Sequence, residues 1–269
     1  MSFQKHEQNG LVWFTADALN AVPHGFSTRR GGVSPAPWDS LNLRPSQGDG
    51  PEALWENYHR FFAALGLNES RAVLSQQTHT ANIRRVTAAD AGKGLLRPRD
   101  YTDVDALITD EPGLSLTVFS ADCGTVLLYD PVRQAIGAVH AGWRGTVNFI
   151  VGRTLEQMRT VYGTEGSEVV ACIGPGISLE SFEVGDEVYD TFRLNGFDMS
   201  RISFRHSVTH KYHIDLWEAN RQQLLDFGVP GVQIEIADIC TYIRHEDFFS
   251  ARRLGIKSGR ILSGIMINS

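Results

Sequence analysis

Three residues of this 269-residue chain have side chains that could share one metal ion: Cys123, His140 and His79. A cysteine thiolate and two imidazoles are ligands that zinc readily accepts in proteins. Such a set leaves zinc a fourth, open position, which is the catalytic and not the structural arrangement. Zinc held there would act as a Lewis acid or lower the pKa of a water towards about 7.

The same three residues permit other interpretations. One cysteine with two histidines also resembles a type 1 copper site, although the chain has no His-x-His pair and so lacks the clustered imidazoles of multicopper oxidases. Without a metal, Cys123 could be a nucleophile with His140 or His79 as its base. A buried thiol and two ordinary histidines would show the same spacing. The residues alone leave these alternatives open.

Two short apolar runs must position Cys123 and His140. The runs, 126–129 and 135–139, are bounded by Asp130-Pro131 and by glycines, which predicts two buried strands. Cys123 lies ahead of the first run and His140 directly follows the second. A cysteine and a histidine at neighbouring strand ends can converge on one site.

His79 belongs to a different part of the chain. Strands are predicted at 73–77 and 83–86, and His79 lies on the turn between them, where a side chain can point into a cleft. Asp122, next to the cysteine, could orient a ligand histidine or cap backbone N–H groups. The site would therefore need three separate chain segments to meet.

The remaining pattern predicts a layered α+β fold. Apolar spacing predicts a helix at 51–65, opened by Gly50-Pro51 and stopped by Gly66, and one helix running from Val147 to Tyr162 after a glycine turn. Further elements are helices at 186–194 and 216–227 and strands at 105–109, 114–119, 169–173, 211–214, 232–236 and 259–267. Short turns between neighbouring strands favour antiparallel pairing over a doubly wound sheet. We expect one domain over 1–269.

Composition excludes several classes of protein. A net charge of −6 and a pI near 5.8 argue against binding to nucleic acid or to a membrane surface. Three widely spaced cysteines argue against a disulfide framework. The start of the chain lacks the apolar core of a signal peptide, and no apolar stretch reaches about 20 residues. We expect a cytoplasmic protein.

Other motif classes do not fit. The glycine turn after His140 is no P-loop, because Gly-Lys-Ser/Thr is absent, and Gly-x-Gly-x-x-Gly, His-Glu-x-x-His and Cys-x-x-Cys are absent too. His206, His210 and His213 resemble a metal cluster, but on a strand His213 would face away from the other two. Cys172 and Cys240 lie in apolar surroundings and are expected to be inert core thiols.

Eight short motifs along the chain together resemble those of a known family. Taken in order along the chain they match the YfiH family, also labelled polyphenol oxidase or laccase-domain proteins: Phe26-Ser27-Thr28-Arg29-Arg30-Gly31-Gly32-Val33-Ser34, Ser40-Leu41-Asn42-Leu43, Gln77-Thr78-His79, Ala121-Asp122-Cys123, His140-Ala141-Gly142-Trp143-Arg144-Gly145, Ile173-Gly174-Pro175, Phe182-Glu183-Val184-Gly185 and Phe249-Ser250-Ala251-Arg252-Arg253. The resemblance covers nearly the whole chain, and its His-Ala-Gly-Trp-Arg-Gly stretch is highly specific.

The resemblance implies an α/β/β/α layered domain similar to the catalytic domain of the cytotoxic necrotizing factors. It also implies a metal site, usually zinc and in some members copper, formed by His79, Cys123 and His140, which would be the catalytic residues. Members of the family phosphorolyse purine nucleosides (adenosine, inosine, guanosine and methylthioadenosine) and deaminate adenosine. The partners would then be a purine nucleoside and phosphate.

Two other activities belong to the family, namely copper-dependent polyphenol oxidation and Cys-His hydrolysis that edits peptidoglycan precursors. If the protein is a phosphorylase, charge and motif position predict four substrate-binding residues: Arg29, Asn42, Arg144 and Arg252. This chain departs from the family pattern at Gly124-Thr125, where a proline is usual two residues after the cysteine, and over 44–49. The pocket wall is therefore expected to differ there.

Overall fold

Two six-stranded sheets form the centre of the computed structural model, which describes residues 2–45 and 48–268. The first sheet consists, in spatial order, of β1 (Phe3–Gln8), β2 (Leu11–Ala16), β3 (His24–Ser27), β15 (Ile261–Ile265), β7 (Ser115–Ser120) and β4 (Ala72–Leu74). The second consists of β14 (Ile234–Ile236), β10 (Val170–Ile173), β8 (Gly124–Asp130), β9 (Ala135–Ala141), β6 (Ala106–Thr109) and β5 (Ile83–Arg85). Both sheets are mixed, because β4–β7, β5–β6 and β10–β14 are parallel pairs and the other pairs are antiparallel.

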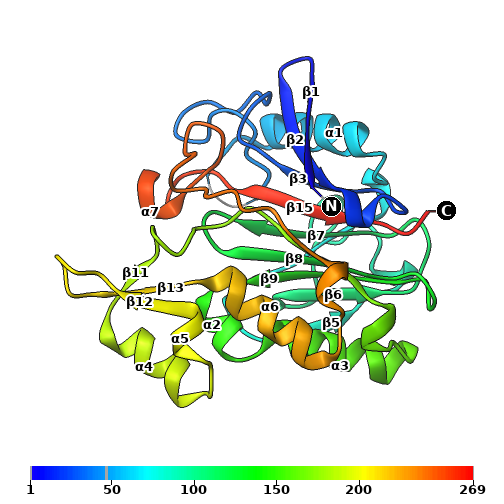
Figure 1. Ribbon diagram of the computed structural model, residues 1–269. Helices are drawn as coiled ribbons and strands as arrows, with labels where there is room; N and C mark the ends of the chain where they lie inside the picture. The colour runs from blue at the N-terminus through cyan, green and yellow to red at the C-terminus, as the bar shows by residue number, and fades with distance from the viewer. Residues whose placement is uncertain (1, 46–47, 269) are drawn as a thin grey trace.

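Helices cover the outer face of each sheet. Figure 1 shows α1 above the first sheet, and α3 and α6 below the second. Tyr58, Phe61 and Phe62 of α1 pack with Trp13 and Leu262 of the first sheet. The helices are α1 (Pro51–Leu65), α2 (Trp143–Val147), α3 (Ile150–Tyr162), α4 (Asp186–Leu194), α5 (Met199–Ile202), α6 (Leu216–Phe227) and α7 (Ala251–Leu254). The order of layers is therefore α/β/β/α.

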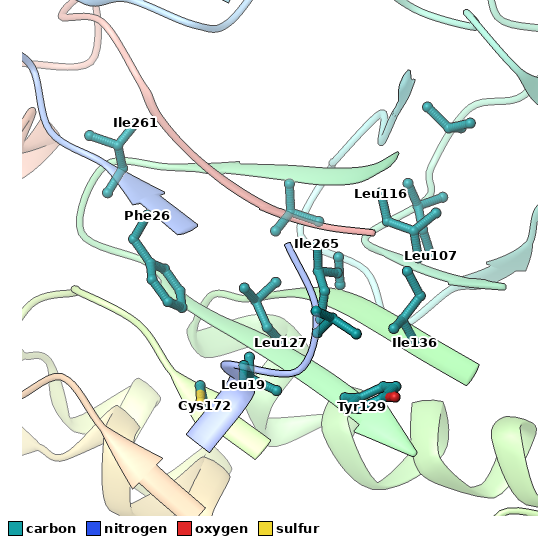
Figure 2. Close-up of a cluster of buried hydrophobic side chains, with 14 of the residues drawn as sticks. Leu19, Phe26, Leu107, Leu116, Leu127, Tyr129, Ile136, Cys172, Ile261 and Ile265 are labelled. Atoms are coloured by element: carbon teal, nitrogen blue, oxygen red, sulfur yellow. The ribbon is translucent and has the colours of Figure 1, made fainter. Parts of the chain in front are cut away.

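The inner core lies between the two sheets, and strand periodicity sorts the side chains into it. In β8, Leu127 and Tyr129 point into this core, whereas Val126 and Leu128 point to the helices on the other face. Figure 2 shows Leu127 and Tyr129 packed in the same cluster as Ile265 of β15. Because burial of each such side chain contributes about 1.5–3 kcal/mol, this cluster fixes how the two sheets stack.

A small third sheet lies beside α2 and α6 (Figure 1). Its strands, in order, are β11 (Glu183–Val184), β13 (Tyr212–Ile214) and β12 (Ser203–Arg205). Ile214 of this sheet packs with Phe192 of α4 and Ile202 of α5 in a cluster of their own. Phe182, directly before β11, lines the same cavity as Cys123.

The predicted mixed α+β class is confirmed, and α1, α4 and α6 have the predicted bounds. The single helix predicted from Val147 to Tyr162 is wrong, because the structure has two helices there. Phe149, between them, adopts a left-handed backbone with φ of 61° and stacks on Phe197 at 5.0 Å. The strand predicted at 232–236 begins only at Ile234, since the preceding residues form a 3₁₀ turn.

Two expectations about the whole chain stay predictions. The one-domain range 1–269 includes residues 1, 46, 47 and 269, which lie outside the described residues. The likeness to the cytotoxic necrotizing factor domain also stays a prediction. Among the described helices, none combines the length and the apolar character needed to cross a bilayer.

Candidate active site

The β8–β9 hairpin brings Cys123 and His140 together. Cys123 precedes the first residue of β8, and His140 is the penultimate residue of β9. The two strands pair antiparallel, with Thr125 opposite His140 and Gly124 opposite Ala141. The start of one strand therefore meets the end of the other, as predicted from the two apolar runs.

The loop between β4 and β5 adds His79, and the carboxylate of Asp105 holds this loop. One carboxylate oxygen accepts the backbone N–H groups of Thr78 at 3.1 Å and Thr80 at 2.9 Å, and the other accepts that of His79 at 3.1 Å. His79 itself has φ of 65°, a left-handed conformation that costs a non-glycine residue about 1 kcal/mol. Three hydrogen bonds to one carboxylate offset that cost.

The same carboxylate orients the second histidine. Asp105 accepts a hydrogen bond from Nδ1 of His140 at 2.7 Å, so Nε2 of His140 is left to face the cysteine. Asp105 is fully buried, and burial opposes its ionisation. The hydrogen bond and charge of His140, with the N–H groups of Thr80 and Thr78, overcome this and hold the pKa of Asp105 at about 2. Sequence reasoning missed Asp105 because nothing marks it among the chain's acidic residues.

The three candidate ligands form one group. One ligand atom from each of His79, Cys123 and His140 lies within 4.8 Å of the others, and Sγ of Cys123 is 3.9 Å from Nε2 of His79. Tetrahedral zinc, with bonds of about 2.3 Å to sulfur and about 2.0 Å to nitrogen, places ligand atoms roughly 3.5 Å apart. Small side-chain rotations would close the difference, so the group fits such an ion.

The electrostatics favour a ligand thiolate. Burial opposes ionisation of Cys123, but the two imidazoles, His140 first, outweigh it and lower the pKa of the thiol to about 6. Burial also opposes protonation of His140, yet the Cys123 charge and Asp105 raise its pKa to about 9. Both shifts favour a thiolate beside an imidazolium when no metal is bound, and a bound cation would replace the imidazolium proton.

Gly142 leaves room for the cluster. A Cβ atom at this position would lie 2.9 Å from Sγ of Cys123 and 3.1 Å from Cδ2 of His79, closer than normal contacts allow. The glycine of the His-Ala-Gly-Trp motif thus allows the backbone entering α2 to pass directly beside two candidate ligands.

Asp122 has the capping role. Its carboxylate accepts the Thr241 hydroxyl at 2.8 Å and the backbone N–H of Arg252 at 2.7 Å. Its backbone is left-handed, with φ of 83°. Asp122 therefore fixes the turn into Cys123 and ties it to the start of α7, whereas Asp105 orients the histidine.

The cluster opens into a cleft of about 530 Å³. Its wall carries three arginines, Arg44, Arg252 and Arg260, none of which has a carboxylate partner among the described residues. Trp143 and Phe182 also line it. Arg260 is buried, and among the described residues its guanidinium donates only to the backbone oxygens of residues 256, 258 and 259. Burial, and then the charge of Arg44, lower the pKa of Arg260 to about 10.

The predicted substrate residues separate into two groups. Arg252 lines the cleft, and Arg144, which is exposed, lies over the ring of Trp143 at 4.4 Å and not on the cleft wall. Arg29 lies in another, larger hollow of about 850 Å³, where it is 2.7 Å from Asp39. This hollow contains no described member of the His–Cys–His group.

Asn42 supports the cleft from behind. It is fully buried, and its side-chain oxygen accepts the backbone N–H groups of Arg260 at 2.9 Å and Arg44 at 3.3 Å.

Arg44 and Arg260 were missed from the sequence, because neither belongs to a motif. The position of Arg44 directly after Ser-Leu-Asn-Leu was the available signal. Ser46 and Gln47, within the stretch that departs from the family pattern, lie outside the described residues.

The histidines on the third sheet form no such group. The prediction that His213 faces away from His206 is wrong, because their rings stack with centroids 5.6 Å apart. Phe204 stacks on His213 as well, at 4.7 Å. Among the described residues, the only grouping of histidine, cysteine and acidic side chains suited to a metal is that of His79, Cys123 and His140.

Comparison with known proteins identifies the family. Residues 23–268 match the model of a family described as multi-copper polyphenol oxidoreductase laccase. The chain belongs to this family. Within the laccase-like family, a solved neighbour is the crystal structure of the Bacillus licheniformis hypothetical protein YfiH, with a TM-score of 0.89, 31% identity and 98% of each chain covered. The resemblance to the YfiH family is thus confirmed.

Two relatives of this laccase-like chain carry enzyme names. The purine nucleoside phosphorylase of Bacteroides thetaiotaomicron is 52% identical over 259 residues, or 96% of each chain. Adenosine deaminase RL5, from an unknown prokaryotic organism, is 36% identical over 245 residues, which are 89% of this chain and 92% of that protein. Both names refer to enzymes that act on purine nucleosides. A phosphorylase cleaves the glycosidic bond, whereas a deaminase cleaves the bond between the purine ring and its amino group.

Proposed function

We propose that this protein is a zinc-dependent purine nucleoside phosphorylase. The observation that carries the proposal is a His–Cys–His group in the wall of a cleft that also holds three arginines, none of which pairs with a carboxylate in the described part of the chain. The names of the relatives that cover nearly the whole chain support it. The arginines supply the positive charge that an inorganic phosphate needs, and the group supplies ligands for a cation.

His79, Cys123 and His140 would hold the metal, with Asp105 fixing the tautomer of His140. When bound, zinc supplies Lewis-acid chemistry beside the substrate. Copper is the alternative that the family description names, and the same ligands accept it. Loading the protein with either ion before assay distinguishes the two metals.

The rest of the chemistry belongs to the protein's own side chains. Arg252 and Arg260 would bind phosphate and direct one oxygen at the anomeric carbon of the ribose. The bond from that oxygen to the carbon forms as the glycosidic bond breaks, and the base leaves with the bonding electrons and takes up the proton that hydrogen phosphate loses. Trp143 and Phe182 offer aromatic surface to the purine ring.

The direct test is to incubate zinc-loaded protein with inosine and phosphate and to measure hypoxanthine and ribose 1-phosphate. We expect release that depends on phosphate and disappears in Cys123→Ala. Cys172→Ala is the matched control, because Cys172 is a fully buried core thiol away from the cleft, and its burial raises the pKa of that thiol. Release without phosphate, or equal release by Cys123→Ala, would contradict the proposal.

Adenosine deamination is the second candidate, favoured by the relative named adenosine deaminase. It would use the same cleft, with water in place of phosphate as the nucleophile and ammonia as the leaving group. The two reactions are separated by their products: adenosine gives inosine and ammonia in phosphate-free buffer if deamination occurs, and adenine with ribose 1-phosphate if phosphorolysis occurs.

A further inference from the structure

A second, smaller chamber adjoins the cleft. Its volume is about 170 Å³, and Arg44, Gln77 and Phe119 line both spaces. Gln77 is a fixed part of the wall, because its side chain accepts the N–H of Phe119 and donates to the oxygen of the same residue, both at 2.7 Å. We call this chamber the annex.

The annex is positively charged. Its lining includes Arg44 and Arg99 and, among the described residues, no aspartate or glutamate. Neither arginine has a carboxylate within ion-pair distance in the described chain. Arg99 donates one hydrogen bond, to the backbone oxygen of Ser75, and no described residue accepts one from the guanidinium of Arg44. Most of their ten N–H donors are therefore available to a ligand.

Two like charges held together at a half-buried site repel each other. Burial, and then the charge of Arg99, lower the pKa of Arg44. An anion between the two guanidinium groups would remove this repulsion and form charge-assisted, bidentate hydrogen bonds. The pair thus has the chemistry of an oxyanion site.

The size of the annex limits what can occupy it. At about 30 Å³ per water, 170 Å³ holds roughly five or six waters, which is room for a phosphoryl group and not for a nucleoside. Its described lining includes none of His79, Cys123 and His140. A phosphoryl group in the annex would therefore contact none of the three candidate ligands, as expected for a part of the substrate that is not transformed.

We propose that the annex binds the 5′-phosphate of a purine nucleotide while the nucleoside portion occupies the cleft. The inference rests on the proposed function and names its substrate class, which would include purine nucleoside 5′-monophosphates. The ribose would lie at the junction formed by Arg44, Gln77 and Phe119, with the base towards Trp143. The reaction is unchanged, since the 5′-phosphate takes no part in bond breaking.

Calorimetric titration of zinc-loaded protein with inosine 5′-monophosphate and with inosine tests the binding without any turnover. We expect the nucleotide to bind about tenfold to a hundredfold more tightly, the range of one or two charged hydrogen bonds. Arg99→Gln should abolish this difference and leave inosine binding within about twofold. Arg99→Lys, which keeps the charge and loses the planar fork, should retain part of it.

Arg97→Gln is the matched control, because Arg97 belongs to the same loop, is exposed and donates to the backbone oxygens of Ala89 and Ala91 outside the annex. Equal affinities of the wild type for nucleotide and nucleoside would overturn the inference. So would an Arg99→Gln variant whose KM for phosphate rises with inosine as substrate, because the annex would then hold the co-substrate. A protein that releases no base from either compound contradicts the proposed function, while the titration still tests the annex.

Discussion

Asp105 and His140 contact each other twice: Nδ1 of His140 donates to the Asp105 carboxylate at 2.7 Å, and the backbone N–H of His140 donates to the backbone oxygen of Asp105 at 2.8 Å. Because the same carboxylate accepts the N–H of His79, one buried aspartate determines the positions of both histidines. The geometry of the candidate metal group therefore depends on a residue that is not itself a ligand.

Asp105→Asn tests this dependence. The amide has nearly the same shape but no charge, so it should hold His140 in the wrong tautomer and weaken zinc binding by about tenfold to a hundredfold. Competition with a chromophoric chelator measures the affinity. Asp103→Asn is the control, since Asp103 lies on the same segment and accepts only exposed hydrogen bonds through its side chain. Equal zinc affinity in the two variants would contradict the role given to Asp105.

Cys123→Ser should lose most of the bound metal, because a serine hydroxyl is a far poorer zinc ligand than a thiolate. The measurement is metal content after dialysis, together with the thiolate-to-metal absorption of cobalt-loaded protein. Cys240→Ser should keep both signals, since the Cys240 sulfur contacts Ser178 and Ser181 and is not one of the grouped ligand atoms. Full metal content in Cys123→Ser would exclude the cysteine as a ligand.

Gly142→Ala should impair metal binding with little change in overall stability. Its added Cβ, 2.9 Å from the Cys123 sulfur, must displace one of two candidate ligands. We expect zinc affinity to fall by at least about tenfold. Gly152→Ala is the comparison, because there the nearest atom is 4.0 Å away and the position is inside α3. That variant should gain about 0.5–1 kcal/mol in unfolding free energy and bind zinc normally.

Arg260→Gln should raise the KM for phosphate by about tenfold or more, because a buried guanidinium facing the cleft is lost. Arg29→Gln should change this KM by less than about twofold, since Arg29 lies in the other hollow and pairs with Asp39. Steady-state kinetics with saturating inosine gives both values. If the KM for phosphate rises in Arg29→Gln and not in Arg260→Gln, Arg29 is the phosphate-binding residue, as expected from its motif.

The pH dependence of stability should reflect Asp90. Burial raises its pKa, but hydrogen bonds from Lys93, Arg84 and Thr87 outweigh burial and lower it to about 2. A pKa lowered by folding adds stability above the unfolded pKa of about 3.9, and this contribution disappears as the pH falls towards 2. Asp90→Asn should therefore cost about 2 kcal/mol at pH 7 and much less near pH 2.

Urea titrations of wild type and Asp90→Asn at pH 7, 4 and 3 measure that difference. Asp190→Asn serves as the control, because Asp190 pairs with Arg193 on the exposed face of α4 and should matter little at any pH. A wild-type advantage that is constant over this range would exclude Asp90 as its source.

Local signals in the sequence were enough for several elements. α1 begins at Pro51 after Gly50 and ends before Gly66, which has φ of 67°, as proline and glycine preferences predict. The apolar runs at 126–129 and 135–139 predicted the β8–β9 hairpin, and with it the approach of Cys123 to His140. Each of these depends on residues close together along the chain.

The sequence could not show that Arg44 and Arg260 reach the cleft and that Arg29 does not. Arg29 belongs to the most distinctive arginine motif, yet it lies elsewhere, whereas Arg44 and Arg260 meet because Asn42 binds the backbone of both. These residues are separated by more than two hundred positions, and no pattern of period two or 3.6 links them. The break between α2 and α3 has a similar cause, since Phe149 leaves the helix to stack on a distant ring.

By itself the sequence determined the family, the mixed α+β class and the candidate metal group of His79, Cys123 and His140, because motifs and local periodicity are visible without knowledge of the fold. The tertiary structure alone decided that Asp105 orients both histidines and that Arg44, Arg252 and Arg260 share the cleft. Those relationships arise from the stacking of two sheets, whose buried faces bring loops together irrespective of their distance along the chain.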